Sequence, residues 1–238
     1  MIGKRVHVWA WAGFAAQVVF VASWLIAAAW QGGGYDPLAH TISDMYAVTA
    51  PAGLFLVIVL TLCGLATILF ALLAVRPTLR PGGRGAPIGA ILLALSLYGV
   101  GDALSPFERE ACRLADPGCT AQDQTANLGG QLDSALSTIG IFLFIAAAFT
   151  LAATMKRIPS WHRWARPTRW TAIGFILLLI AFVIAQPADL GGLLERLLAA
   201  YGAAAIALLA WRTAHPSPAP TDATPAPEGA APNSADQA

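Results

Sequence analysis

Six apolar stretches, each long enough to cross a membrane as a helix, follow one another between Val6 and Trp211. About 20 apolar residues suffice to cross the hydrocarbon core of a bilayer. In lipid, a segment of this length satisfies its own backbone hydrogen bonds only as a helix. We therefore expect an all-α, polytopic integral membrane bundle of six transmembrane helices. The predicted spans are residues 8–30, 51–75, 86–105, 130–154, 169–187 and 190–211.

The composition supports this class of protein. Of the 238 residues, 57% are hydrophobic and only 11% are charged, whereas a soluble domain carries about 25% charged residues. Six helices within residues 1–212 leave no room for a separate soluble domain. Residues 213–238 are rich in Pro and Ala without apolar periodicity, which predicts a disordered cytoplasmic tail. The basic residues are divided among several loops, so we expect no nucleic-acid partner.

The Lys and Arg residues lie almost entirely on one side of the predicted spans. The segments on that side hold eleven of them, whereas the loops on the other side hold only Arg109 and Arg113. Because short cytoplasmic loops are enriched in Lys and Arg, we expect both termini in the cytoplasm of a multi-pass plasma-membrane protein. The lipid bilayer is then the predicted partner, and the sequence specifies no protein partner.

Two cysteines, Cys112 and Cys119, lie in the long loop on the outer side, between the third and fourth spans. Disulfides persist in that compartment, so we predict a bridge between them; two free thiols are the alternative. No His or further Cys lies nearby to complete the four ligands of a zinc site, and no metal ligands are assigned.

The loop after the first span contains a polar run from Tyr35 to Tyr46. If this run is helical, His40 and Asp44 are four residues apart and lie on one face. A His beside a carboxylate could then act as a base. The alternative is a short amphipathic helix at the membrane interface, in which Ser43 or Asp44 bonds to the backbone.

Asp102 lies fifteen residues after Pro87 in the third span, or about 22 Å along a helix. This places it near the outer end of the span. A carboxylate at such a depth is costly and normally faces a polar interior. The alternative is an interfacial residue that the outer leaflet solvates.

The fourth span opens with Gln131, Asp133 and Ser134, and Ser137 continues the polar edge. Asp133 could simply favour the helix N-terminus through the helix dipole. That explanation does not account for Gln131 or Ser137, so a polar surface toward a ligand is the second interpretation.

The sixth span carries Glu195 and Arg196 toward its outer end. Opposite charges inside a membrane are tolerated when they are paired or solvated, and Asp102 or Asp133 could supply a bridge. Structural pairing and ligand binding both fit. Taken together, these polar groups share one depth and one side, which predicts a pocket between helices that opens to the outer face.

The run from Tyr35 to Asp44, the segment from Asp102 to Phe107 and the segment from Gly192 to Leu197 resemble the domain of unknown function 998 family. The His-x-x-Ser-Asp run is the most specific element, and the resemblance spans the whole membrane region. It implies a six-helix prokaryotic membrane protein and supplies no activity. That family often has a His near the start of the fourth helix. Gln131 or its neighbours occupy that region here, so this chain lacks a group that a His-based mechanism would use.

The first functional hypothesis is a membrane-embedded enzyme that acts on a lipid or isoprenoid. His40 would be the base and Asp44 its orienting partner, while Asp102 and Asp133 would be acids or electrostatic stabilisers. A lipid-like ligand is the expected small-molecule partner. The residues expected to contact it are Ser43, Gln131, Ser134, Glu195 and Arg196.

The sequence does not identify a cofactor. Of the four His residues, only His40 lies on the outer side, so a His-rich zinc site is not expected. A divalent cation such as Mg²⁺ or Ca²⁺ could be held by carboxylates at Asp44, Asp102 and Asp133.

Two other functions stay open. One is an accessory or binding protein that presents the loop of residues 107–127 to a partner. The other is a small transporter whose acidic groups bind a cation or a proton. The sequence shows no internal repeat of the kind that many transporters contain.

Overall fold

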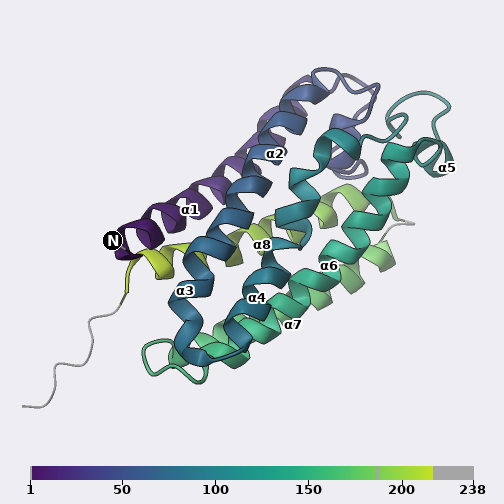
Figure 1. Cartoon of the computed structure of the whole chain (residues 1–238). Helices are drawn as coiled ribbons and strands as arrows, with labels where there is room; N and C mark the ends of the chain where they lie inside the picture. Colours follow the sequence, from purple (N-terminus) through teal and green to yellow (C-terminus); the bar gives the residue numbers. More distant parts are fainter. Residues whose placement is uncertain (1, 186–187, 217–238) are drawn as a thin grey trace, which may run out of the picture.

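The computed structural model describes residues 2–185 and 188–216. These residues form helices and no strands, which confirms the all-α class. The helices pack lengthwise into one bundle (Figure 1). Five helical runs in the described part of the chain are long and apolar enough to cross a membrane. Their main helices are α1 (Ile2–Ala27), α2 (Gly53–Phe70), α6 (Leu128–Met155), α7 (His162–Ala185) and α8 (Gly191–Ala214).

Short helical segments extend two of these runs. A 3₁₀ turn, η1 (Ala28–Trp30), continues α1. The helix α2 continues without a break to Gly82. The added segments are the π turn η3 (Ala71–Val75), the helix α3 (Arg76–Leu79) and the 3₁₀ turn η4 (Arg80–Gly82).

The third predicted span is not one continuous helix. The helix α4 (Gly85–Ala94) ends before Ser96, whose backbone is extended with φ −69° and ψ 174°. The π turn η5 (Leu97–Gly101) then follows. A Cβ atom on Gly99 would collide with the carbonyl oxygen of Ala94, so the tight return of the chain requires glycine at this position.

The other boundaries differ by smaller amounts. The helix α7 begins at His162 instead of residue 169 and accommodates Pro167. The helix α8 continues to Ala214. The predicted turn at 186–187 and the predicted tail from residue 217 onward lie outside the described residues.

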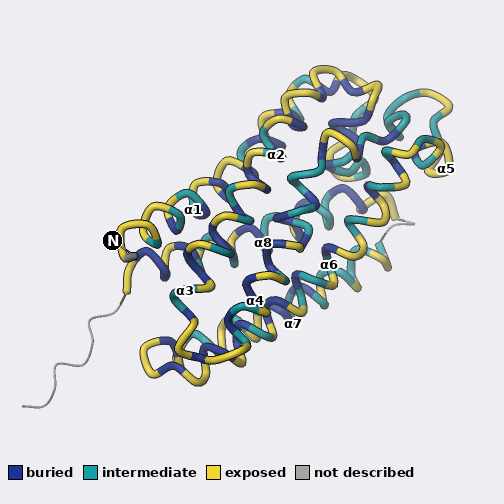
Figure 2. Tube along the Cα trace, viewed as in Figure 1, coloured by how far each residue is buried: buried dark blue, intermediate teal, exposed yellow. Residues whose placement is uncertain are grey.

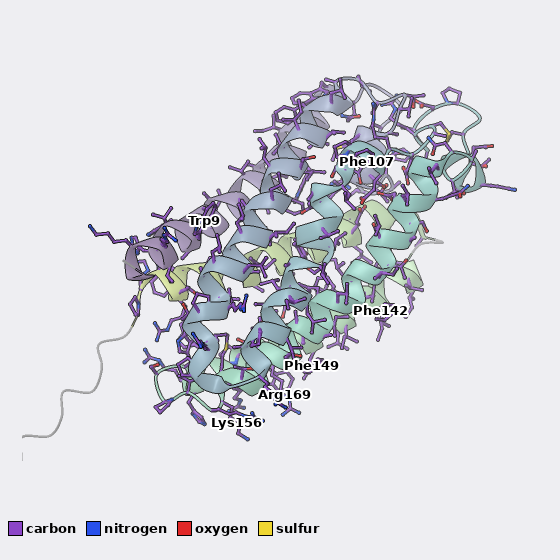
Figure 3. All side chains as sticks on the ribbon, in the orientation of Figure 1. Trp9, Phe107, Phe142, Phe149, Lys156 and Arg169 are labelled. Carbon is purple, nitrogen blue, oxygen red and sulfur yellow. A yellow bond between two sulfur atoms is a disulfide. The ribbon has the colours of Figure 1, made fainter. Side chains whose placement is uncertain are left out.

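The charged residues divide the bundle into two ends. The loop of residues 156–161 and the start of α7 lie at what we call the basic end, where Figure 3 shows Lys156 and Arg169. Residues 31–52 and 102–127 lie at the opposite, acidic end (Figure 1). Described residues near the two chain termini meet at the basic end, since His7 Nδ1 lies 3.3 Å from the Ala214 carbonyl oxygen.

The core runs through the middle of the bundle, and exposed side chains cover its outside (Figure 2). The Phe144 ring lies 5.0 Å from Tyr98 and 4.8 Å from Phe175, measured between ring centroids. Large apolar side chains face outward; Phe142, for example, is 62% exposed and Ile184 is 72% exposed. Lipid is the environment that would cover such an exterior.

Candidate functional site

A 3₁₀ turn, η2 (Ser43–Tyr46), brings the chain back toward the bundle at the acidic end. Asp44 in this turn is fully buried. Its Oδ1 accepts hydrogen bonds from the Leu114 backbone N–H at 2.6 Å and from Gln124 Nε2 at 3.2 Å. Burial raises the pKa of Asp44, and the bond from the Leu114 N–H opposes that shift. Asp44 therefore fastens the loop of residues 107–127 to the η2 turn.

The same loop is closed by the predicted disulfide between Cys112 and Cys119, whose Cα atoms are 6.2 Å apart. Arg113 forms an ion pair with Asp116 at 2.6 Å. Arg109 donates to the carbonyl oxygen of Tyr46 at 2.9 Å. The disulfide and the ion pair brace the loop internally, and the Arg109 bond attaches it to η2. A four-residue helix within it, α5 (Ala121–Gln124), is capped by the Thr120 side chain.

Arg196 and His40 organise the loop that precedes η2. The buried Arg196 guanidinium donates to the carbonyl oxygens of Pro37 at 2.8 Å and His40 at 2.7 Å, and to the Tyr35 hydroxyl. The His40 ring accepts a bond from the Asp36 N–H at 2.8 Å. Among the described residues, Arg196 forms no ion pair, so the bridge to Asp102 or Asp133 considered above is not formed.

A cavity of about 400 Å³ lies between the helices at the acidic end. Four carboxylates from four different parts of the chain line it: Asp102 after η5, Glu110 in the loop, Asp133 in α6 and Glu195 in α8. Among the described residues, the lining contains no Lys or Arg. The cavity is therefore rich in hydrogen-bond acceptors and in potential negative charge.

Hydrogen bonds from the protein orient three of these carboxylates. Asp133 Oδ1 accepts a bond from the Tyr46 hydroxyl at 2.8 Å. Glu110 Oε2 accepts one from Gln124 Nε2 at 2.9 Å. Glu195 Oε2 accepts one from the Ile42 backbone N–H at 2.9 Å. Glu110 Oε1 also accepts a bond from Ser43 Oγ at 3.4 Å. Asp133 and Glu195 each have a second oxygen, so the site is pre-oriented and can still accept hydrogen bonds from a ligand.

The lining also contains large apolar side chains. Phe20 comes from α1, Leu60 from α2, Leu97 from η5 and Phe182 from α7. A cavity lined by both polar groups and apolar side chains is typical of a ligand site. Its chemistry suits a molecule with a polar head and an apolar tail.

Two loop carboxyls at this end hold protons unusually strongly. Burial, and after it the nearby charge of Asp133, raises the pKa of Glu108 and of Glu110 to about 8. Glu108 is only 3% exposed, and its Oε1 has no hydrogen-bond partner among the described residues. At neutral pH both carboxyls are therefore mainly protonated and can donate.

The structure brings together some of the predicted site residues. Those that line the cavity are Ser43, Asp102, Asp133, Ser134 and Glu195. Those outside its lining are His40, Asp44, Gln131 and Arg196. The catalytic and ligand-binding roles of all nine stay predictions.

Sequence reasoning missed Glu110, and it saw no role for Tyr46. Glu110 lies in a polar loop, where a carboxylate normally reflects solvation, and no periodic pattern signals its burial. The bond from Tyr46 to Asp133 joins positions 87 residues apart. Only the folded chain shows that contact.

A metal site is not evident in the described part of the chain. There, no three Asp, Glu, His or Cys side chains are grouped in a way that could hold a metal ion. Both oxygens of Asp44 face backbone N–H groups of the loop, at Leu114 and Ala115. The set of Asp44, Asp102 and Asp133 is thus not gathered around one point.

The long apolar helices and the apolar exterior are those of a polytopic, membrane-spanning helical protein. The chain belongs to a protein family of unknown function, DUF998, whose family model matches residues 14–212. This match confirms the resemblance seen in the sequence, and it includes the whole cavity lining. The family description assigns no activity. No curated protein and no solved structure matches the chain.

Proposed function

We propose that this protein binds an amphiphilic molecule in the cavity at its acidic end. A cationic or hydroxyl-rich head group would lie among the carboxylates of Asp102, Glu110, Asp133 and Glu195. The apolar tail would lie along the apolar side chains of the lining, such as Phe20 and Phe182. The observation that carries the proposal is a cavity whose lining, within the described part of the chain, has four carboxylates and no Lys or Arg.

The negative charge of the ionised carboxylates determines which kind of head group can bind. A phosphate or carboxylate head would be repelled by the ionised members of the set, and the repulsion is stronger in a low-dielectric interior than in water. Binding such an anion would need a metal ion or basic side chains. A cation, or a neutral head with several hydroxyl groups, needs neither.

The distribution of Lys and Arg indicates on which side of the membrane the cavity would open. Eleven basic residues lie on one side of the spans and two on the other, which would place the basic end in the cytoplasm. The acidic end would then face the outer side of the plasma membrane. The disulfide between Cys112 and Cys119 fits that compartment.

The proposal is tested with two probes of equal chain length, dodecyltrimethylammonium and dodecanoate, added to the protein in lipid nanodiscs. We expect the cation to bind and to raise the midpoint of thermal unfolding, and we expect the anion to do neither. Asp133→Asn or Glu195→Gln should weaken binding of the cation by about tenfold or more, because a charged contact is lost.

Asp189→Asn is the matched control, since Asp189 is an exposed carboxylate at the same end and does not line the cavity. It should leave the affinity unchanged. Equal binding of cation and anion, or equal loss in all three variants, would contradict a specific acidic site.

A second candidate function is acid–base catalysis on the bound molecule, as in an enzyme that acts on a lipid or isoprenoid of the outer leaflet. The observation that favours it is the pKa of Glu110, about 8, in the same cavity as Asp133. A proton donor and an acceptor in one site are what general acid–base catalysis requires.

This enzyme hypothesis is checked by mass spectrometry of membrane lipids incubated with the purified protein. Glu110→Gln should abolish turnover while the bound lipid is retained. Product formation that persists at the original rate in that variant would exclude Glu110 as the proton donor.

The other two functions receive less support from the geometry. The loop of residues 107–127 is bonded to η2 through Asp44 and Arg109, so it covers the acidic end instead of projecting toward a partner. Transport would need a path to the basic end. The cavity lining contains no residue of the basic end.

A further inference from the structure

The outside of α6 carries polar side chains where a membrane helix normally presents apolar ones. Gln131, Ser134 and Thr138 are all exposed and line an open groove of about 470 Å³. They are three and four residues apart, so they follow one another along one helix face. One turn further, Phe142 returns the surface to the apolar character that lipid requires (Figure 3). The polar stretch is thus confined to the end of α6 beside the cavity.

This groove and the acidic cavity meet. Ser134 and Thr138, together with Thr125, line both of them. The outer wall of the groove adds Ala135 and Ile139, which do not line the cavity. A polar path therefore leads from the side of the bundle into the cavity.

Hydroxyl groups on α6 behave in two ways. Thr138, Thr150 and Thr154 each donate to the carbonyl oxygen four residues earlier, which is how hydroxyls are normally satisfied inside a helix. Ser134 and Ser137, on the cavity side, form no side-chain hydrogen bond within the described residues. These two hydroxyls are available to a polar group that passes along the path.

The neighbouring helix, α7, covers this side of the bundle but has few buried residues. Only 11% of the apolar window of α7 is buried, against 33% for α6 and 39% for α8. Phe182 of α7 nevertheless lines the cavity. The cavity is thus separated from the bilayer here by a helix that has few buried contacts.

We propose that the groove on α6 is a lateral entrance through which the polar head of the ligand passes from the bilayer into the cavity. The head would pass Gln131 and exchange hydrogen bonds with the hydroxyls of Ser134 and Ser137 while the tail stays in lipid. The inference rests on the proposed function and narrows it: the ligand is a membrane-borne amphiphile and not a water-soluble cation.

The test compares a membrane-borne cation with a soluble one on immobilised nanodiscs that contain the full chain. The probes are dodecyltrimethylammonium and tetramethylammonium. Ala135→Trp fills the groove without replacing a residue of the cavity lining, and Ile139→Trp does so at a second position. Phe142→Trp is the matched control, because it adds an indole at a lipid-facing position outside the groove.

We expect Ala135→Trp and Ile139→Trp to slow association of dodecyltrimethylammonium about tenfold, which corresponds to about 1.4 kcal/mol in the barrier. The equilibrium affinity should change little, because an entrance controls rate. Association of tetramethylammonium, and of both cations with Phe142→Trp, should stay unchanged. An unchanged association rate for the long-chain cation, or equal slowing of both cations, would contradict the proposal that the groove is an entrance. If the unmodified protein bound neither cation, the proposed function itself would fail, and the entrance with it.

Discussion

Most Lys and Arg side chains at the basic end are exposed, with Arg212 the exception, whereas several carboxyls at the acidic end are buried. At the basic end, Lys156, Arg157 and Arg169 are exposed, and a charge in that position costs little. At the acidic end, Asp44 and Glu110 are buried, at 0% and 8% exposure. Burying a carboxyl costs free energy unless hydrogen bonds compensate for it. Exposed charge is sufficient to orient a membrane protein, so the buried carboxyls at the acidic end require another explanation. Asp44 holds the loop of residues 107–127, and Glu110 lines the cavity.

The largest expected effect on stability comes from removing a buried carboxylate, compared with removing an exposed one in the same loop. Asp44→Ala would leave the Leu114 N–H and the Gln124 amide without their acceptor. We expect a loss of about 4 kcal/mol in the free energy of unfolding in micelles, because buried donors are left unpaired. Asp36→Ala, at an exposed position, should cost far less. Equal losses would show that burial at this end has no special energetic role.

The next effect is a dependence of stability on pH. The pKa of Glu108 and of Glu110 rises from 4.5 to about 8 on folding, so the folded state holds more protons than the unfolded state between these values. The contribution of these two carboxyls to stability should therefore be greatest below pH 4.5 and should be lost as the pH rises through 8.

Unfolding measured across this pH range checks the sign of this dependence. Glu108→Gln should flatten the curve, because the amide does not ionise. Asp189→Asn, at the exposed carboxylate, should leave the curve as it is. Stability that rises with pH would contradict the assigned protonation of the two carboxyls.

Removal of the disulfide should have a smaller effect. The bridge between Cys112 and Cys119 closes a short loop with a sequence separation of 7, and constraint of such a loop is worth about 2 kcal/mol. The double variant Cys112→Ser/Cys119→Ser should match the reduced protein. The remaining cysteine, Cys63, is buried, so reductant should not change the double variant any further.

The smallest effect is expected at the basic end. Lys156→Ala and Arg169→Ala remove exposed charges, and each should change the free energy of unfolding by less than about 0.5 kcal/mol. The same unfolding assay provides the measurement. A loss comparable to that of Asp44→Ala would remove the contrast between the two ends.

Hydropathy alone predicted much of the fold. The order of the long helices, the shared end of the two described termini and the disulfide all follow from apolar length, charge distribution and cysteine placement. The break at Ser96 does not, because residues on both sides of it are apolar. It depends on Gly99 approaching the Ala94 carbonyl and on the Tyr98 hydroxyl, which donates to the Ala199 carbonyl oxygen at 3.0 Å. The first is a feature of the local backbone, and the second is a tertiary contact between positions 101 residues apart.

The candidate site was predicted in part for a similar reason. Asp102, Asp133 and Glu195 lie in spans, where a carboxylate stands out against an apolar background. Glu110 lies in a loop, and its burial depends on how that loop folds onto the bundle. His40 precedes the 3₁₀ turn η2, and its ring nitrogen bonds to the Asp36 N–H. Local spacing could not show that bond because the expected helix did not form.

The interruption of the third predicted span has a consequence for how the protein is made. The ten residues of α4 rise only about 15 Å, half of the roughly 30 Å hydrocarbon core. Such a segment is too short to span the bilayer by itself during synthesis. It packs against α6, which the ribosome produces later. Placement of this segment in the bilayer would therefore depend on a helix that does not yet exist when α4 leaves the ribosome.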